Sequence, residues 1–120
     1  MPFNIVVERL PRYVRYQASG PASLKNYADL IDQAASETIA AHDRLVMVDL
    51  RGVVGRLYFS DQFFIGELVV RKLQHLERLA TVVPDDPDSY NSQKVAARHD
   101  FHLRGFRGEG EARAWLLEGG

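Results

Sequence analysis

The chain has 120 residues, 46% of them hydrophobic and 26% charged, and its 15 basic and 16 acidic side chains leave a net charge of −1. This length fits a single domain, residues 1–120, with one core, and the near-balanced charge argues against nucleic acid as a partner. The absence of cysteine excludes disulfides, thiol catalysis and thiolate metal ligands.

The N-terminal third predicts two paired strands and a helix. Residues 3–10 are apolar and rich in β-branched side chains, which indicates a strand. Residues 12–18 alternate between two faces, which indicates a half-exposed second strand that pairs with the first as an antiparallel hairpin. Apolar residues at helical spacing then predict a helix from about Ser23 to His42.

The middle of the chain predicts a buried strand and a second long helix. Residues 45–50 are nearly all apolar and run into Asp, Arg and Gly, a pattern typical of a buried parallel strand that ends in a turn. We expect a loop over residues 51–59. Ser60 and Asp61 offer side-chain oxygens for the free amides of a helix that runs to about Leu76.

The C-terminal third predicts two strands and two helices. A short apolar strand is expected over residues 79–83. Asp86 and Pro87 predict the start of a helix that ends near Arg98. The more polar stretch 101–106 predicts an edge strand, and residues 109–117 predict the last helix.

Together these elements predict an α/β domain with the order β-β-α-β-α-β-α-β-α. Repeated strand-helix units favour right-handed crossovers and parallel strand pairs. We therefore expect a mixed five-stranded sheet with four helices, in which the first strand is antiparallel to the second and the other pairs are mainly parallel.

Three segments carry a family resemblance: Ser19-Gly20 ahead of the first helix, Asp49-Leu50-Arg51-Gly52 after the third strand, and the tail Phe106–Leu116. With this element order, nearly the whole chain resembles the SpoIIAA-like branch of the STAS superfamily, whose members are mostly uncharacterised bacterial proteins. The resemblance implies the βα-superhelix fold that STAS domains share with CRAL-TRIO lipid-exchange domains.

The chain departs from the regulatory members of that superfamily ahead of its second helix. The resemblance associates anti-sigma-factor antagonists with a phosphorylatable Ser in an Asp-Ser-Ser-Gly-type turn. Here the region reads Tyr58-Phe59-Ser60-Asp61-Gln62-Phe63, without the flanking pattern or the following Gly. We therefore do not expect phosphorylation of Ser60 to act as a switch.

The second helix is more apolar than packing on its own sheet requires. Its expected core face carries Ile65, Val69, Leu73 and Leu76, yet Phe64 and Leu68 lie to one side of that face. Neighbouring helices bury this flank in one interpretation. In the other, the flank and the preceding loop face a second subunit or an apolar ligand, and the candidate residues are Leu57, Tyr58, Phe59, Phe64 and Leu68.

A weaker candidate is an anion site at the carboxyl ends of the strands. Arg51, Arg56 and Ser60 would hold an anion there together with the first amides of the second helix. In the alternative interpretation these residues are solvated or paired loop groups. The spacing of a phosphate-binding loop is absent.

Catalytic and metal motifs are missing from the sequence. Ser60, His75 and Asp49 can be combined on paper into a hydrolytic trio, but no Gly-x-Ser-x-Gly motif exists. His99 and His102 straddle an expected helix-strand junction, which disfavours a shared metal. We expect no catalytic residue, no metal and no cofactor.

The sequence favours a non-catalytic binding or regulatory module that docks a protein partner or a second copy of itself through the surface of the second helix. A homodimer is the expected assembly. The alternatives are a carrier or sensor of a small apolar or anionic ligand and, third, an enzyme. Because no signal peptide and no apolar run of about 20 residues is present, we expect a cytoplasmic protein without an integral membrane segment.

Overall fold

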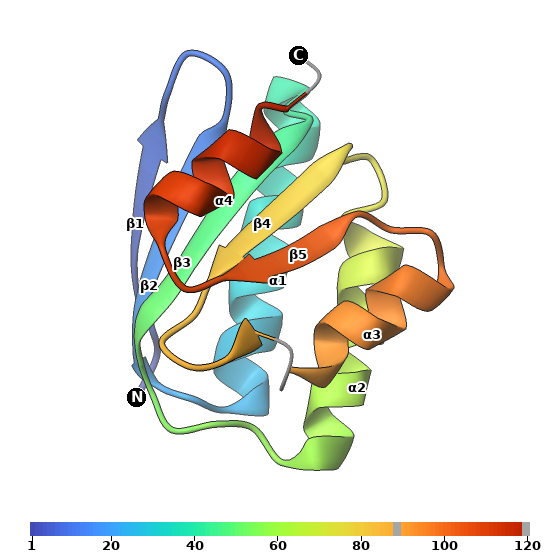
Figure 1. Ribbon diagram of the computed structural model, residues 1–120. Helices are drawn as coiled ribbons and strands as arrows, with labels where there is room; N and C mark the ends of the chain where they lie inside the picture. Colours follow the sequence, from blue (N-terminus) through green and yellow to red (C-terminus); the bar gives the residue numbers. More distant parts are fainter. Residues whose placement is uncertain (88–89, 119–120) are drawn as a thin grey trace.

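The protein is built on one five-stranded mixed sheet, which a computed structural model describes for residues 1–87 and 90–118 (Figure 1). The strands lie side by side in chain order, so β1 and β5 form the two edges. Their bounds are β1 Asn4–Arg9, β2 Val14–Pro21, β3 Leu45–Val54, β4 Arg78–Val82 and β5 Leu103–Phe106.

The pairing of the strands confirms the expected topology. β1 is antiparallel to β2, and the pairs β2–β3, β3–β4 and β4–β5 are parallel. The edge position of β5 is confirmed too. The predicted alternation between two faces of β2 is also confirmed, because every second residue, Val14, Tyr16 and Ala18, is fully buried.

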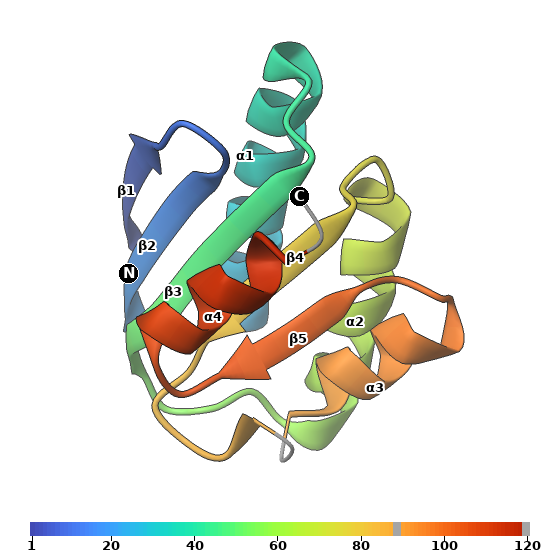
Figure 2. The same cartoon turned by 45° about the horizontal axis from the view of Figure 1, so that its top comes forward.

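Four helices cover the two faces of this sheet unequally. α1 (Leu24–Ala41) and α2 (Phe59–Lys72) pack on one face, and α3 (Asn91–Arg98) lies beside α2 next to β5. α4 (Glu109–Leu116) crosses the opposite face by itself, as Figure 2 shows. Within the described part of the chain, none of the helices combines the length and apolar character that a membrane crossing requires.

Each face of the sheet has its own apolar core. Side chains of β2, β3, α1 and α2 form the larger cluster, which includes Tyr16, Val48, Leu30 and Ile65. The smaller cluster lies under α4; its buried members are Met47, Ala80, Val82, Phe106, Ala112 and Leu116. Because the side chains of a strand point alternately to opposite faces, β3 and β4 contribute to both clusters.

The prediction of a loop over residues 51–59 is wrong in its first half, since β3 continues to Val54. Gly52 pairs with Ser19 just beyond a shift in the β2–β3 register. A Cβ on Gly52 would lie only 2.9 Å from the Cβ of Ser19, so glycine permits the two strands to stay paired here. β3 is longer than expected because it stays paired with β2. The apolar pattern within one strand does not indicate how far its neighbour extends beside it.

Two helix starts also differ from expectation. Tyr58, not Ser60, is the N-cap residue of α2, and no side chain caps this end. α3 begins at Asn91 after Tyr90, so the expected start at Asp86 and Pro87 is wrong. Residues 88 and 89 of that expected helix lie outside the described residues.

Candidate functional site

The N-terminal end of α2 exposes three large aromatic side chains. Tyr58 is 82% exposed, Phe59 68% and Phe64 52%. The Phe59 ring is also in edge contact with Phe63, with centroids 4.9 Å apart. Phe59 and Phe64 are separated by about 8 Å of helix axis. At about 100° per residue, Phe64 lies about 140° around the helix from Phe59, so the two rings do not share one face. We call the end of α2 that exposes Tyr58, Phe59 and Phe64 the aromatic patch.

The other two members of the expected apolar surface are not part of this patch. Leu68 is only 6% exposed and belongs to the core beneath α2, so it does not share the exposed side of Phe64. Leu57 is half-buried and lines a cavity. Residue spacing placed Leu68 beside Phe64 on the helix surface but did not indicate how far the core extends around α2.

A glutamine anchors the loop that carries the patch. The Gln62 side chain donates from Nε2 to the carbonyl oxygen of Leu57 at 3.1 Å. Its Oε1 accepts from the backbone N–H of Asn91 at 3.1 Å and from Asn91 Nδ2 at 2.9 Å. Gln62 thereby ties the β3–α2 loop to the start of α3.

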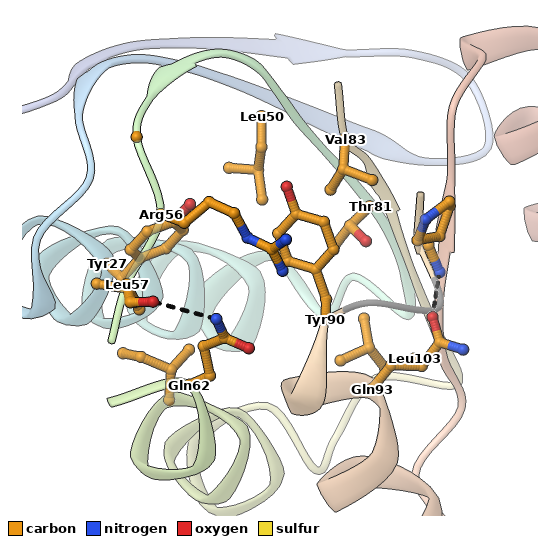
Figure 3. A pocket seen from close by; sticks show the side chains of 14 residues that line it. Tyr27, Leu50, Arg56, Leu57, Gln62, Thr81, Val83, Tyr90, Gln93 and Leu103 are labelled. Carbon is orange, nitrogen blue, oxygen red and sulfur yellow. Dashed lines mark hydrogen bonds between the residues drawn. The ribbon is translucent and has the colours of Figure 1, made fainter. Parts of the chain in front are cut away.

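A cavity opens at the same end of the molecule, between the carboxyl ends of β3 and β4 and the helices α1, α2 and α3 (Figure 3). A hollow of about 60 Å³ lies beside a more apolar hollow of about 80 Å³. The residues that line both hollows are Tyr27, Leu50, Ile65, Thr81 and Leu103.

The polar groups of this cavity gather at its mouth. The Arg56 guanidinium lies 4.1 Å from the centroid of the Tyr90 ring, a cation–π contact seen across the centre of Figure 3. Burial is the main cause that raises the pKa of Tyr27 to about 12, and burial also raises the pKa of Tyr90. Both phenols are consequently protonated at neutral pH and able to donate hydrogen bonds.

The expected anion site does not assemble. Arg51 Nη2 donates to Asp49 Oδ2 at 2.8 Å and also contacts Glu109 Oε1 at 3.2 Å, on the α4 side of the sheet. Arg56 instead contacts Tyr90, on the side of α3. Ser60 is an exposed residue in the first turn of α2. Arg51 and Arg56 thus contact different parts of the chain, and the described contacts do not bring Ser60 to either of them.

Asp49 is the centre of a buried ion network. Its carboxylate is 4% exposed and accepts from the side chains of Arg15 and Arg51 and from the backbone N–H of Arg51. Both guanidiniums also contact Glu109 at the start of α4. Burial alone would raise the pKa of Asp49, but the hydrogen bonds from Arg51 and both positive charges outweigh it and lower the pKa. The network joins β2 and β3 to α4.

The hydrolytic trio considered from the sequence is dispersed. Asp49 is held by arginines, and His75 Nε2 lies 2.7 Å from Thr38 Oγ1 on the other face of the sheet. Ser60 contacts neither of them through any hydrogen bond that the structure describes. Among residues 1–87 and 90–118, no group of three or more His, Cys, Asp or Glu side chains is placed to hold a metal ion.

Sequence reasoning missed the residues of the cavity mouth. Tyr27, Tyr90 and Gln93 belong to no motif in the sequence. The available signal was positional: β3, β4 and β5 are parallel, and ligands of such sheets bind beyond the carboxyl ends of the strands. That rule places Arg56 at this end of the sheet, where it lines the cavity, but does not identify which helix side chains meet it.

Comparison with known proteins places the fold. No family model matches the chain, and no curated protein matches it. Among solved structures, it is similar to an uncharacterised SpoIIAA-like protein of the DUF3478 family from Shewanella loihica PV-4, with a TM-score of 0.63 and 16% identity over 97% of this chain and 94% of that one.

Two regulatory proteins are similar as well. An anti-sigma factor antagonist from Mycobacterium paratuberculosis has a TM-score of 0.63 and 15% identity over 97% of this chain and 95% of that one. The anti-sigma factor antagonist SpoIIAA in its unphosphorylated form has a TM-score of 0.58 and 12% identity over 97% and 99%. The chain therefore has the SpoIIAA-like fold, which confirms the resemblance at the level of the fold.

Proposed function

We propose that this chain, an α/β domain with the SpoIIAA-like fold, is a non-catalytic binding module whose partner docks on the aromatic patch. The partner is a protein, either a second copy of this chain or a different one. The observation that carries the proposal is the exposure of Tyr58, Phe59 and Phe64 within one stretch of seven residues. Singly exposed apolar residues are ordinary, whereas three large exposed aromatic side chains at one end of a helix favour an interaction surface.

The chemistry of the patch fits a protein partner. Tyr and Phe are enriched at protein interfaces because their rings bury a large area with few rotatable bonds. A Phe side chain buries about 200 Å², so covering the exposed half of Phe64 contributes about 2.5 kcal/mol. The Gln62 bridge holds the loop at Leu57 in place, which lowers the entropy lost when Tyr58 is covered.

The two similar structures that are anti-sigma factor antagonists support a regulatory role for such a module. Their names give anti-sigma factors, which are proteins, as what they act against. The cytoplasm is the compartment we propose for this chain.

The test replaces Phe64 by Asp and compares the variant with the wild type by sedimentation. We expect the wild type to sediment as a dimer of the 13.6 kDa chain and Phe64→Asp to sediment as a monomer. Loss of the buried ring and the cost of desolvating a carboxylate should weaken association by at least roughly thirtyfold. Ile39→Asp is the matched control, because Ile39 is 55% exposed on α1, outside the patch.

A monomeric wild type would refute self-association and leave a different protein as the partner. Quantitative capture from the native host then decides: the wild type and Ile39→Asp should retain a protein that Phe64→Asp loses. If all three baits retain the same proteins in equal amounts, the patch is not a docking surface and the proposal is wrong.

A further inference from the structure

We propose that the free edge of β1 is a self-association surface, at which two copies of this chain join antiparallel about a two-fold axis at Val6. The surface is separate from the aromatic patch, because β1 lies at the opposite side of the sheet from α2 (Figure 1). The proposal rests on the direction of the β1 backbone groups, on the lack of protection at this edge, and on the order of the β1 side chains.

The hairpin of β1 and β2 shows which backbone groups of β1 point outward. The N–H of Leu10 donates to the carbonyl oxygen of Tyr13 at 2.9 Å, so these two residues form a hydrogen-bonded pair. The same register continues without a shift along all of β1. Because hydrogen-bonded and non-hydrogen-bonded pairs alternate in an antiparallel ladder, the N–H and C=O groups of Ile5, Val7 and Arg9 point away from β2.

The other edge of the sheet is protected, whereas β1 is not. β5 has only four residues, and its Gly105 N–H donates to Gln93 Oε1 of α3 at 2.9 Å. β1 has six residues without lysine, proline or a register shift, and its two charged residues stand together at its C-terminal end. Short or charged edge strands and covering elements are the usual means of preventing strand-to-strand contact. The first four residues of β1 therefore offer an open template for another strand.

The side chains of β1 suit such a contact on both faces of the sheet. Ile5 packs against the larger core, and Val7, which is 37% exposed, pairs with Tyr16 on the same face. Val6 points to the opposite face beside Gln17 and is 51% exposed. An added strand would cover these β-branched side chains with cross-strand neighbours, which stabilises a sheet.

A second β1 strand matches the first when the two-fold axis passes through Val6, perpendicular to the sheet. Ile5 then lies opposite Val7 of the second copy, so their outward N–H and C=O groups form hydrogen bonds in both directions. Val6 lies opposite Val6 of the second copy in a non-hydrogen-bonded pair, and Asn4 lies opposite Glu8. Apolar residues thus meet apolar residues, polar residues meet polar residues, and no two like charges meet.

Other positions of the axis fit less well. An axis at Val7 would place Ile5 opposite Arg9 and Val6 opposite Glu8, which sets charged side chains against apolar ones. An axis at Ile5 would leave the C-terminal half of β1 without a partner. An axis at Glu8 would bring two carboxylates together. The order of residues along β1 therefore selects a second copy of the same strand in a single register.

The contact is weak by itself. One pair of six-residue strands belongs to the small class of interface, below about 1,200 Å² in total, which is typical of transient association. We expect a dissociation constant of about 1 mM for pairing through β1. At about 50 µM, fewer than about a tenth of the chains then pair in this way. Phe64→Asp consequently still sediments as a monomer at such concentrations.

The first experiment introduces one cysteine into this cysteine-free chain, in the Phe64→Asp background, and follows disulfide formation in oxidised glutathione. Val6→Cys should cross-link at least about tenfold faster than Ile39→Cys, because the Cα atoms of a non-hydrogen-bonded pair lie about 4.5 Å apart, within reach of a disulfide. Ile39, 55% exposed on α1, controls for random collision. Val7→Cys tests the register: its two copies are offset along the strands by more than about 7 Å and should cross-link no faster than Ile39→Cys.

The second experiment measures the strength of the contact by sedimentation of Phe64→Asp over a range of concentrations. More than half of the chains should be paired at about 2 mM. Adding Val6→Lys should keep the protein monomeric there, because it sets two positive charges opposite each other at the axis. Adding Val6→Thr retains the β-branched shape and should change the dissociation constant less than about threefold.

Fast cross-linking of Val6→Cys alone and the loss of pairing in Val6→Lys support the proposal. It is overturned if Val6→Cys reacts no faster than Ile39→Cys, if Val7→Cys reacts as fast as Val6→Cys, or if Phe64→Asp stays monomeric at about 2 mM. If Val6→Lys does not fold, the cross-linking rates decide by themselves. A failure of the aromatic patch would appear as equal masses of the wild type and Phe64→Asp at about 50 µM and would leave these rates unchanged.

Discussion

The buried carboxylate of Asp49 offers the sharpest test of how the two faces of the sheet are joined. Replacement by Asn keeps the shape of the side chain and removes its charge. Asp49 accepts four hydrogen bonds, three from Arg51 and one from Arg15, at 2.8 to 3.0 Å. The Arg15 side chain is only 13% exposed, so its charge depends on partners inside the protein.

The expected loss follows from these contacts. Removing one partner of a buried ion pair lowers the free energy of unfolding by about 3–5 kcal/mol. Two features reduce that figure here: Glu109 continues to pair with both guanidiniums, and the Arg51 side chain is 44% exposed. We expect Asp49→Asn to lower the free energy of unfolding by about 2–3 kcal/mol. With a typical urea dependence of about 1.5 kcal/mol/M, the midpoint falls by about 1.3–2 M.

Urea denaturation at several pH values measures this loss. Because the folded pKa of Asp49 lies below the value of 3.8 found in unfolded chains, the carboxylate stabilises the protein above pH 3.8. This stabilisation disappears as the pH falls through the folded pKa. The wild type and Asp49→Asn should therefore differ at pH 7 and converge in strong acid.

Asp29→Asn is the control, because Asp29 pairs with Lys25 on the exposed surface of α1 and should contribute less than about 0.5 kcal/mol. A loss at pH 7 no larger in Asp49→Asn than in Asp29→Asn would refute the assignment of Asp49 as the centre of a stabilising network. A difference that persists unchanged below pH 3 would show that charge is not its cause.

Two further predictions test the packing of α2 and the burial of Tyr27. Leu68→Ala should lower the free energy of unfolding by about 2–4 kcal/mol because it leaves a cavity in the core. Phe64→Ala, on the exposed side of the same helix, should lower it by less than about 1 kcal/mol. Equal losses for the two variants in urea denaturation would contradict the described packing. Because the pKa of Tyr27 is raised to about 12, ionisation of this residue should cost the wild type about 2–3 kcal/mol of stability as the pH rises from about 10 to 12. Tyr27→Phe should lose less stability over that range. Identical free energies of unfolding for the two proteins across that pH range would contradict the burial of the phenol.

The local pattern of apolar and polar residues was sufficient to predict the helices and strands and their order. The alternation in β2, the apolar run of β3 and the helical spacing of α1 each report which face of one element is buried, and those faces agree with the structure. The ends of the strands and helices are harder to predict, since they depend on pairing between elements. β3 reaches Val54 because β2 continues beside it, and Gly52 in that pairing had been assigned to a loop.

The apolar residues of α2 illustrate what a sequence reports about a surface. Its composition indicated more apolar side chains than one sheet requires, and Phe64 is indeed half exposed while Leu68 is in the core. A helical wheel gives the angle between two side chains but not the width of the groove that receives them. That width is set by the position of α1 and α3 on either side of α2.

The sequence by itself determined the fold class, because the period of the apolar residues is a property of each segment. Only the tertiary structure decided which polar groups meet. Arg51 and Arg56 are five residues apart, yet one pairs with Asp49 and Glu109 and the other lies against Tyr90. The physical reason is that Glu109 and Tyr90 are far along the chain from these two arginines, and sequence spacing carries no information about which distant residues meet.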